Sequence, residues 1–348
     1  MNRPSFIARL HPPTLPARET RFSATLGLGG ISLLLYLLLI VTGIPLTAAY
    51  TPTAAAASES IRAITFILPY GWLLRNLHYW TAVLLLLSGA LHLLRVVLTG
   101  GYKPPRRLNW LLGLAALLLS LLLSFSGYVL RWDVDTVGAL TVAANTIRQT
   151  PLLGGWFYGL LVGGPDIADA TLVRFHTWHT LGLSLPVLFL LGWHVFRARR
   201  NGGWATRQSA AAAQPPDVRL MWREWRQRAG VAVLALLCLL MGLALWLDAP
   251  LAPAVDGVNI LVTAVTPIII TPWFLVWIQA LLRHLPPLLA GIVIPLALLA
   301  LLALLPWTLD RTQTGVGVWF NREGRWAQVV VLFLFSALVS LTLWEWWR

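Results

Sequence analysis

Histidines stand out in two apolar stretches of this 348-residue sequence, where a polar ring is costly unless its nitrogens are bound. The stretch RNLHYWTAVLLLLSGALHLLR contains His78 and His92, which are 14 residues apart. The stretch RFHTWHTLGLSLPVLFLLGWH contains His176, His179 and His194, and the last two are 15 residues apart. On α-helices these intervals correspond to about 21 Å and about 22.5 Å, and each places its two rings on roughly one face.

Matched pairs of histidines on two helices predict two stacked sites, each built from one imidazole of each helix. Such pairs in a dry helical bundle are typical of bis-histidine haem b. A zinc ion would need four ligands, and neither carboxylates nor thiols occur at this depth. Hydrogen bonds to carbonyls would explain a single histidine but not four at matched spacing. We therefore predict two haem b groups whose iron ligands are His78, His92, His179 and His194.

Glycines repeat at the same interval in two other apolar stretches. Gly29 and Gly43 are 14 residues apart, and so are Gly113 and Gly127. A porphyrin lying against a helix requires a missing side chain at the point of contact. We expect these four glycines to supply four such gaps on the two helices that lack histidines.

Three arginines and one further histidine lie close to the predicted sites. Arg75, Arg95 and Arg174 stand at membrane boundaries, where each can pair with a haem propionate or extend toward the interface, two compatible roles. His176 is spare, because pairing it with His194 would stretch that interval to about 27 Å. We expect it to be a polar or proton-handling neighbour of the outer site, or simply an interface residue.

The composition indicates a polytopic membrane protein. Hydrophobic residues make up 58% of the chain and charged residues only 11%, against roughly a quarter in soluble domains. Apolar stretches long enough to span a membrane, at about 20 residues each, predict seven spans. They lie near residues 26–49, 76–98, 108–130, 177–196, 229–247, 286–307 and 327–344.

The net charge of +13 is a topology signal and does not indicate nucleic-acid binding. Most Lys and Arg residues precede the first span or follow the second, fourth and sixth, whereas the opposite loops carry Asp and Glu. The positive-inside rule therefore predicts an N-terminus on the cytoplasmic side. The first residues lack the pattern of a secretory signal, so we expect a cytosolic tail. Cys238, the single cysteine, lies inside the fifth span, where we expect a packing role.

Residues 258–282 are also apolar enough to span. An eighth span, however, would move Arg311, Arg322 and Arg325 to the outer side. We therefore predict an outer loop and an interfacial helix for this segment.

Several stretches resemble cytochrome b of the quinol-oxidising Rieske/cytochrome b complexes, with the cytochrome b6 branch most similar. They are LGLGGISLLLYLLLIVTGIPLTAAYTPT, GWLLRNLHYW, LHLLRVVLTGGYKPPRRLNW, SGYVLRWD and TLVRFHTWHT, and the resemblance runs from about Leu26 to Gly202. It implies that His78 and His179 ligate the outer haem, and that His92 and His194 ligate the inner one. The C-terminal part, through TPWFLVWIQALLRHLPPLLAG, resembles subunit IV, the smaller partner of cytochrome b6.

The resemblance implies an all-α integral membrane protein in which a four-helix di-haem bundle is followed by three further transmembrane helices. We expect a cytochrome b6-like domain at 1–203, a cytoplasmic linker at 204–227 and a subunit IV-like domain at 228–348. The implied partners are a Rieske iron–sulfur protein, a c-type cytochrome, the quinone pool and a second copy of the chain in a larger complex. One lysine against 25 arginines points to a GC-rich bacterial gene, and hence to a bacterial plasma membrane.

Three departures from the family pattern bear on function. The family's outer quinol pocket has a Pro-Glu-Trp-Tyr motif whose glutamate accepts a quinol proton, but Thr271-Pro272-Trp273-Phe274 stands here and contains no carboxylate. Asp133, Asp248, Asp256 and His284 are the candidate substitutes. Gly27 occupies the position of a cysteine that binds an extra haem covalently in the cytochrome b6 branch, so no such haem is expected. Arg131 replaces a family proline.

Two main functions follow from the resemblance. In the first, the chain is a subunit of a quinol–cytochrome c (or similar acceptor) reductase, catalytic only within its complex, with Trp273 and Phe274 in the outer quinol pocket. It moves electrons from outer quinol to inner quinone, with proton translocation. In the second, the chain is a di-haem membrane anchor and conduit that does not bifurcate electrons, an alternative that the missing glutamate favours. A di-haem anchor of a dehydrogenase or hydrogenase is a more distant possibility.

Overall fold

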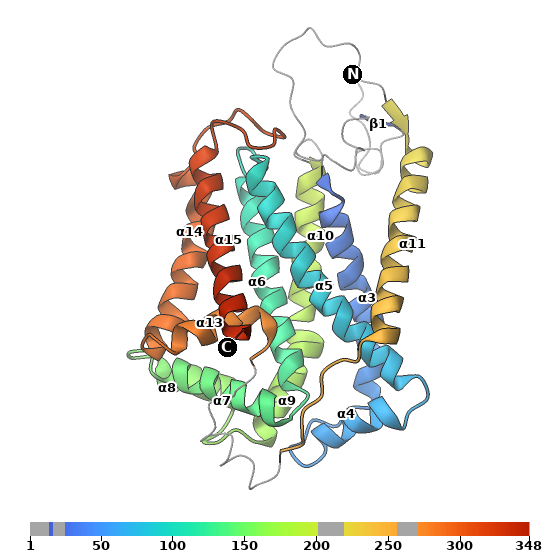
Figure 1. The fold of residues 1–348 in the computed structure, drawn as a ribbon, viewed down its shortest axis with the longest axis vertical. Helices are drawn as coiled ribbons and strands as arrows, with labels where there is room; N and C mark the ends of the chain where they lie inside the picture. Colours follow the sequence, from blue (N-terminus) through green and yellow to red (C-terminus); the bar gives the residue numbers. More distant parts are fainter. Residues whose placement is uncertain (1–13, 17–24, 201–218, 256–270, 348) are drawn as a thin grey trace.

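The computed structural model describes residues 14–16, 25–200, 219–255 and 271–347, which form a bundle of long helices (Figure 1). Seven helical segments of the described residues are long and apolar enough to cross a membrane, which confirms the predicted spans. They are Leu28–Ala48 (α3), Gly71–Leu98 (α5), Arg107–Val129 (α6), Asp169–Arg200, Arg226–Trp246, Leu289–Thr308 and Arg325–Trp346 (α15). Many large apolar side chains on these helices are exposed, as expected of surfaces that face lipid.

Two of these spans carry more than one label, and a third is part of a longer helix. The fourth consists of Asp169–Thr177 (α9), Trp178–Gly182 (η1, a π-helix) and Ser184–Arg200 (α10). The fifth lies within Trp222–Trp246 (α11), and the sixth joins Leu289–Val293 (η3) to Ile294–Thr308 (α14). A short antiparallel strand pair, Thr14–Pro16 (β1) with Arg219–Met221 (β2), is the exception to the helical fold in the described residues.

Shorter helices gather at one end of the bundle, which we call the outer end after the predicted orientation (Figure 1). They are Ala57–Phe66 (α4), Val134–Arg148 (α7), Gly154–Val162 (α8) and Val276–Leu282 (α13), the last preceded by a 3-10 turn at Trp273–Leu275 (η2). The apolar segment Trp273–Leu282 is too short to span a membrane. Within 271–282, the prediction of a short helix in place of an eighth span is therefore confirmed. Residues 258–270 of that prediction lie outside the described residues.

The second and fourth spans begin earlier than the sequence predicts. The second span begins at Gly71 and so takes in Arg75, which lies before the predicted start. The polar groups of Arg75 and of the next residue, Asn76, bond the chain that follows α11. The Asn76 amide donates to Asp248 Oδ1 at 3.1 Å, and its oxygen accepts from the Ala249 amide at 2.9 Å. Because these polar groups are satisfied inside the protein, the helix can continue beyond its apolar part.

Apolar side chains of five spans form the centre of the bundle. One cluster joins α3, α5, α6, α10 and α11 through buried Leu35, Tyr36, Leu85, Leu123, Val187 and Leu240. The Tyr36 hydroxyl donates to the backbone carbonyl of Ser184 within this cluster. Packing between these helices fixes the relative positions of α5 and the fourth span, which carry the histidines.

The π-helix η1 lies between the two histidines of the fourth span. Leu183 N bonds Trp178 O at 2.7 Å, a step of five residues where an α-helix takes four. Pro186, which has no N–H, removes the donor that Gly182 O would otherwise meet. A π-turn absorbs one extra residue, so the 15-residue interval from His179 to His194 corresponds to the 14-residue interval on α5.

A buried ion cluster ties the two parts of the chain together at the inner end. Lys103, between α5 and α6, and Asp310, after α14, are both fully buried, with Nζ 3.0 Å from Oδ2. Lys103 Nζ also donates to Thr312 Oγ1 at 2.9 Å, to Thr314 O at 2.8 Å and to Asn321 Oδ1 at 3.1 Å. A buried charge needs this many partners to offset its lost hydration. We call Lys103, Asp310, Thr312, Thr314 and Asn321, together with Tyr102, the inner clasp.

Tyr102 completes the inner clasp by donating its hydroxyl to Asp310 Oδ2 at 2.6 Å. Burial and the hydrogen-bonded carboxylate raise the pKa of Tyr102, so the phenol stays protonated. Burial acts to raise the pKa of Asp310, but the hydrogen bonds it accepts, first from Thr312 and then from Tyr102, lower that pKa overall. The inner clasp thus holds an ionised carboxylate with a neutral phenol.

Candidate functional site

The four predicted ligands form two facing imidazole pairs between α5 and the fourth span. The His78 and His179 ring centres are 6.2 Å apart, with an angle of 72° between the ring planes. His92 and His194 repeat this arrangement toward the inner end, at 6.3 Å and 82°. The structure therefore brings together the residues that the sequence pairs, one pair toward each end of the bundle.

Hydrogen bonds on the far side of the outer pair fix which nitrogen carries the proton. His179 Nδ1 lies 3.0 Å from Leu123 O, and a carbonyl can only accept, so Nδ1 carries the proton. His78 Nδ1 lies 2.9 Å from Thr42 Oγ1, whose own hydrogen is directed to Leu38 O at 2.8 Å. Each outer imidazole therefore donates from Nδ1 and keeps the lone pair of Nε2 for a ligand bond.

The inner pair is held differently. His194 Nδ1 donates to Asn109 O at 3.0 Å, which gives it the same tautomer as the outer histidines. His92 Nδ1 is buried and has no hydrogen-bond partner among the described residues. Three of the four rings are thus fixed by an acceptor, and the fourth has no acceptor for Nδ1 within the described ranges.

The gap between the rings would accommodate one metal ion with an imidazole on each side. A metal–imidazole bond of about 2 Å and about 1.1 Å from nitrogen to ring centre, taken on both sides, give about 6.2 Å. The described residues contain no group of three or more His, Cys, Asp or Glu side chains that could hold a metal ion. The remaining ligands would therefore have to come from the bound group itself, as a porphyrin supplies them.

Each predicted glycine lies against one of the four imidazoles. A Cβ on Gly43 would lie 3.1 Å from His78 Cε1, and one on Gly127 would lie 2.5 Å from His179 Cε1. At the inner pair, the corresponding distances are 3.1 Å from Gly29 to His92 and 2.9 Å from Gly113 to His194. The sequence predicts clearance for a porphyrin, and the structure adds that the nearest atoms are those of the imidazole edge. The glycines thus repeat at nearly the same interval as the histidines because each histidine ring packs against a helix at a residue without a side chain.

The three predicted arginines differ in their surroundings. Arg75 is buried and donates to Ala249 O at 3.2 Å and Pro250 O at 2.5 Å, so its guanidinium is engaged with the chain after α11. Arg174 Nη1 donates to the last carbonyls of α8, those of Gly159 and Leu160, at 2.8 and 2.5 Å. A cation at that position satisfies orphan carbonyls of the helix end. Arg95 lies buried one turn after His92, so it is the arginine whose position best matches a site neighbour.

His176 does not join either pair. Its ring stacks on Tyr50 at 5.6 Å with an interplanar angle of 19°, and its Nε2 is buried without a partner among the described residues. The Tyr50 hydroxyl donates to Leu130 O at 2.8 Å, and burial raises its pKa, so it remains a neutral phenol. His176 thus lies at the outer end against Tyr50, which follows α3, and belongs to neither pair.

Arg131, for which the sequence offers no role, has a clear partner. Its guanidinium bonds Asp133 Oδ2 at 2.6 Å and 2.8 Å, lies 3.8 Å from Asp135 and stacks over Tyr128 at 5.0 Å. Asp133 is itself fully buried and caps α7 through the amide of Thr136 at 3.1 Å. Burial and the neighbouring Asp133 raise the pKa of Asp135, while Arg131 acts to lower it. The arginine therefore pairs with Asp133 and offsets part of the negative charge of Asp133 and Asp135 at the entry to α7.

The predicted substitutes for the motif glutamate are mostly committed elsewhere. Asp133 is a helix cap in an ion pair, and Asp248 accepts the Asn76 amide. His284 is exposed just after α13, and Asp256 lies outside the described residues. None of the described candidates is both buried and free of another role.

The sequence analysis missed a carboxylate, Glu345, that contacts the helix following Trp273 and Phe274. Both side chains are half-buried in η2, and their rings meet edge to face at 5.8 Å. Glu345, at the end of α15, reaches α13 and accepts from Arg283 Nε at 2.6 Å. The detectable signal is a lone carboxylate in the tryptophan-rich ending LWEWWR, where only burial distinguishes it from an interfacial residue.

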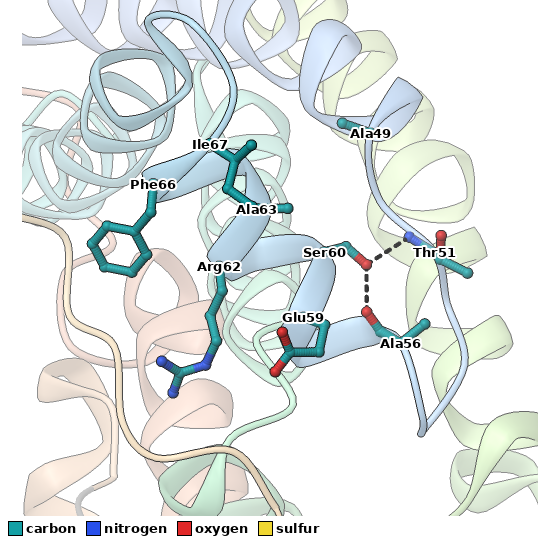
Figure 2. Close-up of a pocket in the computed structure, with 9 residues that line it drawn as sticks. All are labelled: Ala49, Thr51, Ala56, Glu59, Ser60, Arg62, Ala63, Phe66 and Ile67. Atoms are coloured by element: carbon teal, nitrogen blue, oxygen red, sulfur yellow. Dashed lines mark hydrogen bonds between the residues drawn. The ribbon is translucent and has the colours of Figure 1, made fainter.

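An open cavity of about 440 Å³ lies beside α4 at the outer end (Figure 2). Glu59, Arg62 and Phe66 are among its lining residues, and Ser60 accepts from the Thr51 amide at 3.2 Å. It contains none of the four paired histidines and none of the residues near Trp273. The cavity is therefore separate from the candidate site.

Comparisons with known proteins agree with this geometry. Residues 17–202 match the family model described as "Cytochrome b/b6/petB", and residues 261–345 match "Cytochrome b(C-terminal)/b6/petD". The chain is 37% identical over 175 residues to cytochrome b6 of Synechococcus sp. (strain JA-3-3Ab), which covers 50% of this chain and 81% of that protein. It is 38% identical to cytochrome b6 of Cyanidium caldarium with the same coverage.

A solved structure shares the fold over nearly the whole chain. The protein called "Hyperthermophilic respiratory Complex III" superposes with a TM-score of 0.73 at 22% sequence identity, covering 91% of this chain and 82% of that one. Its fold therefore extends over both matched regions. With a family match over more than half of its residues, this integral membrane protein belongs to the cytochrome b/b6 family.

Proposed function

We propose that this chain is the haem b-carrying electron-transfer subunit of a membrane quinol oxidoreductase of the Rieske/cytochrome b type. The observation that carries the proposal is the pair of imidazole gaps, 6.2 and 6.3 Å between ring centres, one toward each end of the bundle. Membership of the cytochrome b/b6 family supports haem b as the group held there. The same membership favours this function over that of a non-bifurcating conduit.

His78 and His179 would hold the outer haem, and His92 and His194 the inner one. When bound, haem b supplies reversible one-electron chemistry at its iron. The protein orients three of the four imidazoles through Nδ1, and the four glycines let each ring approach the neighbouring helix. Arg95, and less directly Arg75 and Arg174, would supply positive charge near the propionates.

The function of this arrangement would be electron transfer across the membrane, from a quinol at the outer end to a quinone at the inner end. Moving one charge against the membrane potential costs about 2.3 kcal/mol per 100 mV, which is the energy such a step conserves. Trp273 and Phe274 are the proposed contacts of the outer quinol. Proton release at the outer end and uptake at the inner end would accompany the transfer.

Two domains are proposed, with a cytochrome b6-like part at 1–203 and a subunit IV-like part at 228–348, joined by a linker at 204–227. The two family matches, 17–202 and 261–345, support this division. We further propose a Rieske iron–sulfur protein and a c-type cytochrome as redox partners, a homodimer within the complex, and the bacterial plasma membrane as its location.

The proposal is tested by oxidant-induced reduction of haem b in membranes that contain the complex, with the inner quinone site blocked. An oxidant pulse to the c-type cytochrome should make haem b more reduced, because outer quinol oxidation then delivers its second electron to haem b. If haem b instead stays oxidised in this sample, while quinol still reduces it from the inner side in a sample without the block, the conduit function is correct.

A further inference from the structure

Glu345 is a buried carboxylate whose charge is balanced from α13. Its side chain is 4% exposed, and Oε1 accepts from Arg283 Nε at 2.6 Å and from Gln279 Nε2 at 3.2 Å. Gln279 and Arg283 are four residues apart, so they lie on one face of the helix segment that faces α15. A buried carboxylate without such partners would be strongly destabilising. This one is stabilised at a single oxygen.

The second oxygen of Glu345 has no donor in the part of the chain that the structure describes. Oε2 is inaccessible to solvent, and none of the described residues hydrogen-bonds it. An ionised carboxylate offers about four lone-pair positions, and leaving a buried acceptor unpaired costs about 1–3 kcal/mol. The arrangement therefore provides a vacant acceptor beside a fixed positive charge. A hydroxyl donor is the ligand chemistry that fits it.

A chain of hydrogen bonds connects Glu345 to the segment that lacks the family's glutamate. Gln279 Oε1 accepts from Thr271 Oγ1 at 2.5 Å and from Thr271 N at 3.4 Å, while its Nε2 donates to Glu345. Thr271 directly precedes Pro272, Trp273 and Phe274. Figure 1 shows the C terminus beside α13 at the outer end of the bundle. The last helix thus brings a carboxylate to a segment that has none in its own sequence.

We propose that Glu345 is the proton acceptor of the outer quinol site, an inference that rests on the proposed function. Oε2 accepts a hydrogen bond from a hydroquinone hydroxyl bound beside Trp273 and Phe274. In the transfer, the hydroquinone O–H bond breaks, an O–H bond forms at Oε2, and the hydroquinone is left as its monoanion. No electron moves in this step. Arg283, which is 40% exposed and directly follows α13, is the basic group that bonds Glu345, and exposed His284 is the next residue in the chain.

The test measures outer-site hydroquinone oxidation in the intact complex by oxidant-induced haem b reduction, with the inner quinone site blocked. Glu345→Gln preserves the size of the side chain and removes the acceptor charge. We expect its maximal rate to fall by about 10²-fold or more, with the hydroquinone KM changed much less, because a lost general base acts mainly on the chemical step. Glu345→Asp should restore part of the rate. Glu59→Gln, which changes an exposed residue of α4 at the same end, should behave as wild type.

Each result decides the matter. A Glu345→Gln rate within twofold of wild type overturns this inference and leaves the proposed function intact. A loss of rate that is accompanied by loss of haem b and not rescued by Glu345→Asp assigns Glu345 a structural role and also overturns it. Absence of oxidant-induced reduction in both wild type and Glu59→Gln overturns the proposed function itself, and this inference with it.

Discussion

The outer and inner histidine pairs have nearly the same ring separation but different support. Both pairs span about the same gap, and every imidazole edge lies against a glycine. At the outer pair, both Nδ1 atoms have an oxygen partner, and each partner set includes a hydroxyl, from Thr42 or from Ser126. At the inner pair, His194 has a carbonyl partner, while His92 has none among the described residues. The ligand geometry is duplicated, and the surrounding hydrogen bonds are not.

This difference predicts unequal reduction potentials at the two sites. A hydrogen bond from Nδ1–H to an oxygen makes the imidazole a more basic ligand, which favours the oxidised iron. The outer pair has such a bond on both ligands, and the inner pair on one. We therefore expect the outer site to have the lower potential, which makes electron flow toward the inner site favourable.

Removing one ligand from each pair should have the largest effect. His179→Ala should abolish the outer haem b and leave the inner one, and His92→Ala should do the reverse, because each gap would retain a single imidazole. Redox titration of the haem b absorption band measures this as loss of one of two components. If both substitutions remove the same component, the pairs do not act as separate sites.

Substitutions at the glycines should affect the outer and inner sites to different degrees. Gly127→Ala would place its Cβ 2.5 Å from His179 Cε1, whereas Gly29→Ala would place it 3.1 Å from His92 Cε1. Overpacking of this kind costs about 1–3 kcal/mol, and the tighter contact should cost more. We expect Gly127→Ala to lower outer haem b content markedly and Gly29→Ala to change inner haem b little. Equal losses, measured by haem extraction and spectra, would contradict the distances.

Much of this site follows from the sequence, and the missing parts have definite physical reasons. Spacing alone pairs the histidines and selects the glycines, because both depend on helical periodicity. It does not reveal the π-helix at Trp178–Gly182, which depends on the missing donor of Pro186. Nor does it find Glu345, whose meeting with Gln279 is a contact between distant helices. The role of Arg131 depends likewise on the burial of Asp133.

Removing a single hydrogen bond from the outer pair should have the smallest effect. Thr42→Val deletes the acceptor of His78 Nδ1, and a bond worth about 1 kcal/mol corresponds to a rise of about 40 mV in the outer potential. Ser126→Ala should shift it less, because His179 keeps Leu123 O. Ser120→Ala, whose hydroxyl bonds only Ala116 O among the described residues, is the matched control. If Thr42→Val shifts the reduction potential of the inner site instead, the assignment of His78 and His179 to the outer site is wrong.

The inner clasp has a consequence for how the chain can be divided. Lys103 and Tyr102 lie in the first family match and Asp310 in the second, yet they form one fully buried cluster. A covalent connection between two parts raises their effective concentration without adding contacts. The recognition between the parts is therefore encoded in the clasp and in the helix packing around it. Two separately expressed polypeptides, cut within the linker, should reassemble into one complex, and Lys103→Met should prevent their association.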